Sequence, residues 1–76
     1  MRGEGFNGYL VLEWRQATGR TQVEAAHLLG VTPQCLSKWE RAETTPRPRH
    51  LLILSNVFAI PVASFFQKDF HLQRVA

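Results

Sequence analysis

The sequence predicts an all-α domain of five short helices, and three observations lead to this fold class. Apolar residues recur at intervals of three and four, and no stretch alternates as a half-buried strand would. Residues that typically start or stop helices interrupt this pattern at several points. The length of 76 residues, 45% of them hydrophobic, suffices for one small core and no second domain.

The first helix is expected over residues 8–18, after a flexible N-terminal arm of residues 1–7. Asn7 is a suitable N-cap, and Gly19 is a suitable stop. The apolar face of this helix carries Val11, Trp14 and Thr18, with Leu10 and Ala17 beside them. This face should pack on the core.

The second helix has the clearest start. Thr21 and Glu24 stand at the two positions of a capping box, in which the Thr21 hydroxyl accepts from the third amide and the Glu24 carboxylate accepts from the Thr21 amide. Gly30 should end the helix. The residues expected to face inward are Ala25, Ala26 and Leu29.

The third helix should begin at Pro33, because Thr32 can cap it and a proline at the first helical position loses no hydrogen bond. Its inner side carries Leu36, Trp39 and Glu40. Its outer side carries Gln34, Ser37, Lys38 and Arg41. Only residues 30–32 separate it from the second helix, so the two form a helix-turn-helix.

A loop of residues 42–47 leads to a fourth helix over residues 48–58. Its core spacing is carried by Leu51, Leu52, Leu54, Ser55 and Phe58. Pro61 should close this helix and open a short fifth one that ends at Phe66. Residues 67–76 form a C-terminal tail whose structure is ambiguous from the sequence, and this tail is a candidate dimerisation segment.

A larger pattern surrounds the helix-turn-helix. Its matching residues are Arg15, Gly19, Thr21, Gln22, Ala26, Leu29, Gly30, Val31, Thr32, Leu36, Trp39, Glu40, Arg41 and Pro46, followed by the apolar Leu51, Leu52, Leu54, Phe58, Ile60 and Phe65. In these positions the chain resembles the phage repressor and Cro family of helix-turn-helix regulators. The resemblance covers residues 8–66 and implies a compact five-helix, lambda-repressor-like domain. It also implies a prokaryotic or phage-encoded transcriptional regulator, most often a repressor, that binds double-stranded DNA.

The chain departs from the family pattern at four positions. Ala42 replaces a glycine; a left-handed backbone would cost about 1 kcal/mol more with alanine, and the favoured alternative is a third helix one residue longer. Arg20 and Ala25 replace two leucines that would form a hydrophobic staple at the start of the second helix. Arg47 stands where a capping serine or aspartate usually begins the fourth helix.

The outer face of the third helix, about residues 33–42, is the candidate for base contacts in the major groove. Gln34 has the donor–acceptor pair suited to adenine, and Lys38 is a donor suited to guanine. Ser37 is small and permissive, and Arg41 could reach a base or a phosphate. The alternative is that these four residues form an ordinary solvated helix face.

The candidates for phosphate contacts lie mainly at helix starts. They are Thr21, Gln22, Thr32, Cys35, Arg47 and Arg49. Because the first turn of the third helix contains no acid, its amides and positive partial charge should remain available to a phosphate near Cys35. Arg47 and Arg49 oppose the dipole of the fourth helix, which suits them to facing phosphates. A plain helix start and a charge-tolerant loop are the alternatives.

Two further expectations concern structure and catalysis. The family resemblance implies a salt bridge between Arg15 and Glu40 beneath the third helix. No enzyme activity, cofactor or metal is expected, since His27, His50 and His71 lack ligand spacing and no acid or histidine near Cys35 would activate its thiol.

The location expected from the sequence is the cytoplasm. The single cysteine allows no internal disulfide, and the first eight residues lack a signal-peptide core. The uncharged run of residues 51–66 is too short to span a bilayer.

The partners expected are DNA and a second copy of the chain. The formal net charge of +3 and the pI near 9.8 favour a polyanion. Family members usually bind palindromic sites as dimers, and the candidate dimer interface is Val62, Phe65, Phe66, Phe70 and Leu72. The alternative is a protein-interaction module, such as an antitoxin or polymerase-binding adaptor, whose partner would be a toxin, an antirepressor or RNA polymerase.

Overall fold

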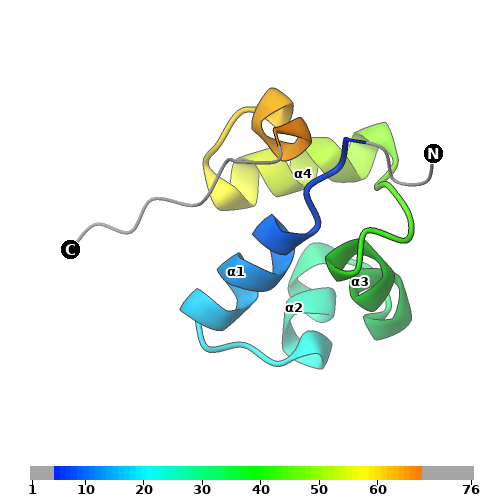
Figure 1. The fold of residues 1–76 in the computed structure, drawn as a ribbon. Helices are drawn as coiled ribbons and strands as arrows, with labels where there is room; N and C mark the ends of the chain where they lie inside the picture. The colour runs from blue at the N-terminus through cyan, green and yellow to red at the C-terminus, as the bar shows by residue number, and fades with distance from the viewer. Residues whose placement is uncertain (1–4, 68–76) are drawn as a thin grey trace.

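The computed structural model describes residues 5–67 of the chain, and Figure 1 shows helices joined by short loops. The elements in chain order are α1 (Tyr9–Ala17), α2 (Gln22–Leu29), α3 (Pro33–Glu40), α4 (Pro48–Phe58) and the 3-10 helix η1 (Val62–Phe66). No strand occurs among the described residues. The all-helical class is confirmed, but the fifth helix is a short 3-10 helix rather than an α-helix.

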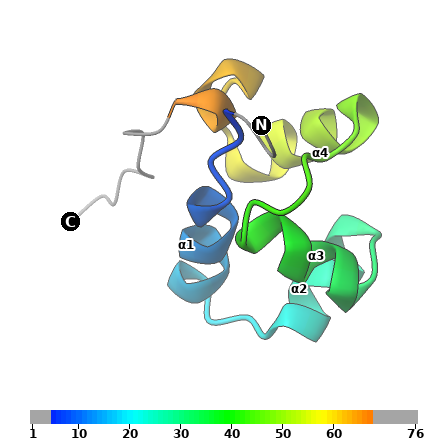
Figure 2. The ribbon, with the colours of Figure 1, turned by 45° about the vertical axis from the view of Figure 1, so that its right-hand side comes forward.

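The helices form two groups, α1 to α3 and α4 with η1, and both groups share one core. α2 packs on α3 across the short turn, and α1 packs on α3 from the other side. α4 contacts η1 and α2 (Figures 1 and 2). Every element contributes to the core, whose buried apolar residues are Phe6, Leu10, Val11, Trp14, Ala25, Ala26, Leu29, Leu36, Trp39, Leu54, Phe58 and Phe65. Among the described residues, no helix has the length and apolar character needed to cross a membrane.

The segment before α1 is part of this core, which corrects the expected flexible arm for residues 5–7. Phe6 is only 4% exposed, and its ring lies 6.2 Å from that of Phe65 and 6.0 Å from that of Phe66. The Asn7 amide donates to the Phe65 carbonyl oxygen at 2.6 Å, and the Asn7 side chain donates to the Gln67 carbonyl oxygen at 3.1 Å. The apolar ring of Phe6 is therefore anchored on η1. Residues 1–4 lie outside the described part.

Asn7 also does not cap α1. The N-cap is Gly8, which provides no side-chain hydrogen bond. Gly8 has an ordinary φ of −63°, but a Cβ at this position would lie 2.1 Å from the Trp39 carbonyl oxygen. A glycine is needed here for space, because the start of α1 touches the end of α3.

The caps predicted for α2 and α3 are confirmed. The Glu24 amide donates to the Thr21 hydroxyl at 3.1 Å, and the Thr21 amide donates to the Glu24 carboxylate at 2.9 Å. The Cys35 amide donates to the Thr32 hydroxyl at 3.1 Å. Between the helices, Gly30 adopts a left-handed φ of 76°. The helix-turn-helix is therefore fixed by local hydrogen bonds at the start of each of its two helices.

Ala42 is left-handed, with φ of 58°, and the longer third helix favoured by the sequence is wrong. α3 ends at Glu40, and two amides then turn back onto its last carbonyls. The Ala42 amide donates to the Trp39 oxygen and the Glu43 amide to the Lys38 oxygen, each at 2.9 Å. This pair of bonds is a Schellman motif, and it holds alanine in the conformation that a glycine would adopt more easily.

Some exposures also differ from the expected helix faces. Ala17 and Thr18 are exposed at the end of α1, where the Thr18 hydroxyl donates to the Trp14 carbonyl oxygen at 2.9 Å. Leu52 is 62% exposed although it lies beside core positions of α4. α4 ends at Phe58 because Ala59 turns left-handed, two residues before Pro61.

Candidate nucleic-acid interface

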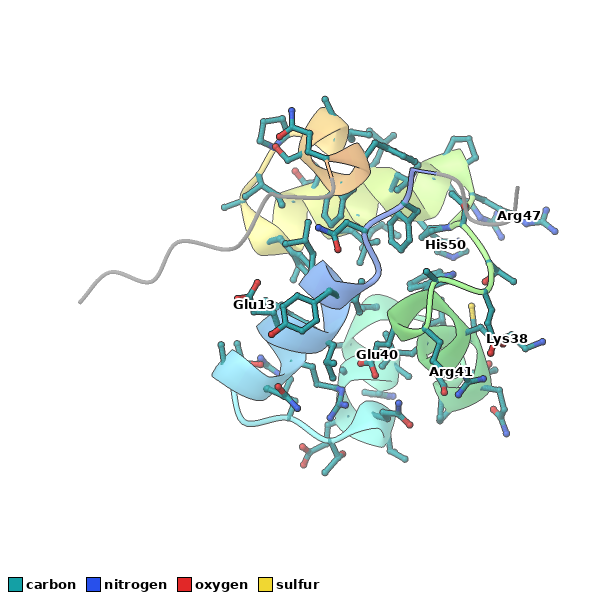
Figure 3. All side chains as sticks on the ribbon, viewed as in Figure 1. Glu13, Lys38, Glu40, Arg41, Arg47 and His50 are labelled. Carbon is teal, nitrogen blue, oxygen red and sulfur yellow. The ribbon has the colours of Figure 1, made fainter. Side chains whose placement is uncertain are left out.

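The outer face of α3 forms a shallow depression of about 430 Å³ on the surface. Its lining residues are Gln22, Pro33, Gln34, Ser37, Lys38 and Arg41. All four residues predicted to contact bases are among them, and none of the lining residues is acidic. Lys38 and Arg41 project outward from α3, whereas Glu40 points toward the body of the domain (Figure 3).

Arg41 is held in place by two neighbours, Ser37 on this face and Glu43 beyond the end of α3. Its Nη1 donates to the Ser37 hydroxyl at 2.6 Å, its Nε to Glu43 Oε2 at 2.8 Å and its Nη2 to Glu43 Oε1 at 3.2 Å. These bonds lower the pKa of the Glu43 carboxyl below its usual range and raise the pKa of Arg41. Glu43 was not among the site residues predicted from the sequence, because only the left-handed turn at Ala42 brings it back beside Arg41.

Beneath this face, Arg15 and Glu40 form the ion pair that the family resemblance implies. Arg15 Nε donates to Glu40 Oε2 at 2.6 Å and Arg15 Nη2 to Glu40 Oε1 at 3.2 Å. The side chains of Arg15 and Glu40 are 16% and 6% exposed. The remaining Arg15 Nη1 donates to the Arg20 carbonyl oxygen at 3.1 Å. The pair therefore links α1 to α3 through two side chains that are largely buried.

Gln22, a predicted phosphate contact, joins the same network. Its Nε2 donates to Glu40 Oε1 at 2.9 Å, and the residue is half-buried. Since an amide nitrogen carries two N–H groups, one remains for another acceptor. Gln22 therefore bridges the buried ion pair and the depression on the surface.

The start of α3 differs from the expectation in one respect. The Cys35 amide, expected to be free for a phosphate, is taken by the Thr32 hydroxyl, and Cys35 itself is half-buried against the core. Thr21 and Thr32 are exposed, and their hydroxyls accept hydrogen bonds in the two caps. Each hydroxyl keeps its own O–H for donation.

Cations flank the start of α4. Arg47 is the N-cap residue and gives no side-chain cap, and the first turn of α4 contains no acid. Arg47 and Arg49 are both exposed. The ring of His50 lies 5.6 Å from that of Trp39, which sets this turn against α3. In the view of Figure 3, Arg47 and Lys38 project to the same side of the domain.

A family model for the Cro/C1-type helix-turn-helix matches residues 11–65, which is most of the chain. The chain belongs to this helix-turn-helix family. The family is one of DNA-binding regulators, so membership indicates DNA as the partner. No curated protein and no solved structure gives a significant match to the chain.

One departure of this helix-turn-helix protein from the family pattern has a structural explanation. Arg20 replaces the leucine before α2, and its guanidinium lies 5.5 Å from the ring centre of Trp14. A cation over an indole face is a favourable contact that also covers apolar surface. The arginine therefore covers Trp14, a buried residue of α1.

The predicted dimer interface of this helix-turn-helix protein is wrong at Phe65. That side chain is fully buried in the core of its own chain, because it packs between the rings of Phe6 and Phe58. Val62 is half-buried and Phe66 is 39% exposed. The other two residues, Phe70 and Leu72, lie outside the described part. Three further apolar side chains are exposed on α4, namely Leu52, Ile53 and Val57.

Within residues 5–67, no group of three histidine, cysteine or acidic side chains that could hold a metal ion comes together. Cys35 has a free thiol. His71, the third histidine considered from the sequence, lies outside the described part.

Proposed function

We propose that the protein is a sequence-specific transcriptional regulator that binds double-stranded DNA through α3 and represses genes whose promoters overlap its site. The observation that carries this proposal is the acid-free lining of the depression on α3, with Gln34, Ser37, Lys38 and Arg41 along one ridge. An α-helix fits the major groove, where each base pair presents a distinct donor and acceptor pattern.

Within the groove, the ridge on α3 would make the base contacts. The Gln34 amide suits the N6 and N7 edge of adenine, and Lys38 suits O6 and N7 of guanine. Ser37 is small enough to admit a base edge beside them. Arg41 stands one turn beyond Ser37 and extends the contact toward the end of the helix.

Phosphate contacts would come from both sides of the ridge. Thr21 and Thr32 can donate their hydroxyl protons, and Gln22 can donate its second N–H. Arg47 and Arg49 add positive charge near the start of α4. The Cys35 amide would not make such a contact, because the Thr32 hydroxyl already accepts its hydrogen bond.

The protein would bind a palindromic operator as a homodimer. One recognition helix contacts only a few base pairs, and two copies would place their helices in successive major grooves about 34 Å apart. The exposed apolar residues of α4 and Phe66 supply surface for such an association.

The experiment that tests this proposal is selection of bound sites from a random pool of duplex DNA. A palindromic motif would support both specific readout and dimerisation. Gln34→Ala and Lys38→Ala should then each weaken binding to the selected site by about 1 to 3 kcal/mol and change binding to random DNA little. Absence of any enriched motif, together with no binding at low salt, would refute the proposal.

A protein-interaction module is the alternative, and the apolar patch on α4 is the observation that favours it. A module of this type, such as an antitoxin or polymerase-binding adaptor, would bind a protein more tightly than DNA. The salt dependence of DNA binding distinguishes the regulator from the module. For a DNA-binding regulator, counterion release should make the affinity for DNA fall with salt at a log–log slope near 0.9 per phosphate contacted. Weak, salt-insensitive binding to duplex DNA would favour the module.

A further inference from the structure

The most specific arrangement on the α3 face is the triad of Ser37, Arg41 and Glu43. An arginine on an exposed helix end usually has many conformations, and its charge attracts phosphates and bases alike. Here three of its N–H groups are already bonded, one to Ser37 and two to Glu43. The guanidinium therefore has a defined orientation before any ligand arrives.

The donors that remain have a particular chemistry. A guanidinium has five N–H groups, so the three bonds leave one on Nη1 and one on Nη2. An arginine uses paired N–H groups of this kind to bind O6 and N7 of guanine in a bidentate manner. One N–H on each terminal nitrogen is therefore left for the two acceptors of such a base edge.

The charge of the triad also favours a base over a phosphate. The Glu43 carboxylate neutralises the formal charge of Arg41 and would repel a phosphodiester approaching it. Stabilisation of the fold is a weak explanation for this pair, because both side chains are at least half exposed and exposed ion pairs add little stability.

The backbone holds the Glu43 carboxylate beside Arg41. The left-handed turn at Ala42 reverses the chain, and the Glu43 amide donates to the Lys38 carbonyl oxygen at 2.9 Å. The carboxylate thus returns to the last turn of α3 instead of following the loop away from it. The acid is positioned by the fold and not only by its attraction to Arg41.

We propose that Glu43 is a specificity-determining residue of the DNA-binding face, which with Ser37 orients Arg41 toward one guanine and withholds it from phosphates. This inference rests on the proposed function, because it assigns a task within DNA readout. It predicts that Arg41 without Glu43 becomes a general phosphate-binding cation.

The test compares the full-length wild type with Glu43→Ala, Ser37→Ala and Arg41→Ala in selection from random duplex DNA and in binding titrations. Arg41→Ala identifies the base pair that Arg41 contacts. At that position, Glu43→Ala should lower the preference for guanine by about 5-fold or more. Its binding to random duplex should strengthen, with a salt slope steeper by about 0.9. Ser37→Ala should lower the same preference to a smaller extent.

The matched control is Glu13→Gln, which also removes one negative charge but lies on α1, on the opposite side of the domain in Figure 3. It should leave the guanine preference unchanged. If Glu43→Ala selects the wild-type motif with the same preference and resembles Glu13→Gln in binding, Glu43 has no role in specificity and the inference is overturned. If the wild type selects no motif, the proposed function fails as well, so the two failures are distinguishable.

Discussion

Replacing Glu40 with alanine should destabilise the fold although this residue lies on the same helix as the DNA-facing ridge. The Glu40 carboxylate accepts three hydrogen bonds, two from Arg15 and one from Gln22. Its removal would leave the Arg15 guanidinium, with a side chain only 16% exposed, without an anion. The Arg20 carbonyl oxygen alone would still accept from Arg15.

The size of the loss in unfolding free energy follows from the burial of Arg15. Breaking a buried ion pair from one side typically costs 3–5 kcal/mol, because it leaves an uncompensated charge. Since Arg15 retains some access to water, we expect the lower end, about 3 kcal/mol. In a domain of this size, that loss corresponds to a fall in melting temperature of roughly 12 to 24 °C.

Thermal and urea unfolding followed by circular dichroism would measure the effect. Lys38→Ala is the matched control, because Lys38 is exposed on the same helix, and it should change the melting temperature by only a few degrees. Combining Glu40→Ala with Arg15→Ala should cost less than the sum of the two single changes. Equal melting temperatures for Glu40→Ala and Lys38→Ala would refute the reasoning.

Three further predictions concern the C-terminal end of α3. Gly8→Ala should lower the free energy of unfolding by about 3 kcal/mol, because the new Cβ would lie 2.1 Å from the Trp39 carbonyl oxygen. If the variant unfolds at the same urea concentration as the wild type, this close approach is contradicted. Ala42→Gly should raise the free energy of unfolding by about 1 kcal/mol, since φ is 58° at this position, and an unchanged or lower midpoint would argue against the left-handed turn. In Arg41→Ala, the pKa of Glu43 should rise toward its usual range, which an NMR titration of the carboxyl would measure; equal values in both proteins would exclude the pair in solution. Because the folded-state pKa is lowered, the pair should persist above the unfolded pKa of Glu43 and be lost as pH falls through the folded one.

The parts of the fold that could be predicted are those determined by local chemistry. The capping box of Thr21 and Glu24 and the cap at Thr32 depend on residues three apart, so the sequence alone reveals both. The outer face of α3 follows in the same way, because helical periodicity separates Ser37 and Lys38 from the buried Leu36 and Trp39. The Arg15–Glu40 pair depends on tertiary contact and could be anticipated only through the family resemblance.

The features that were missed depend on contacts between distant segments. Phe6 is buried because η1 supplies two aromatic rings to receive it, and nothing within residues 1–7 indicates that partner. The sequence placed Phe65 in a dimer interface because the side chains that bury it, Phe6 and Phe58, come from other elements and cannot be identified as its neighbours from the sequence. Glu43 was overlooked because a left-handed alanine is uncommon, and a helix continued by one residue would have placed this carboxylate elsewhere.

The bonds from Asn7 to Phe65 and Gln67 place two segments distant in sequence beside each other, at η1. A short peptide joining residue 67 to residue 5 would therefore close the described fold into a ring with little distortion. New ends could be opened at Gly19, which is exposed and has nothing within 4 Å of its would-be Cβ. A circularly permuted protein of this design should keep the α3 ridge intact and carry any attached label on the α1–α2 turn instead.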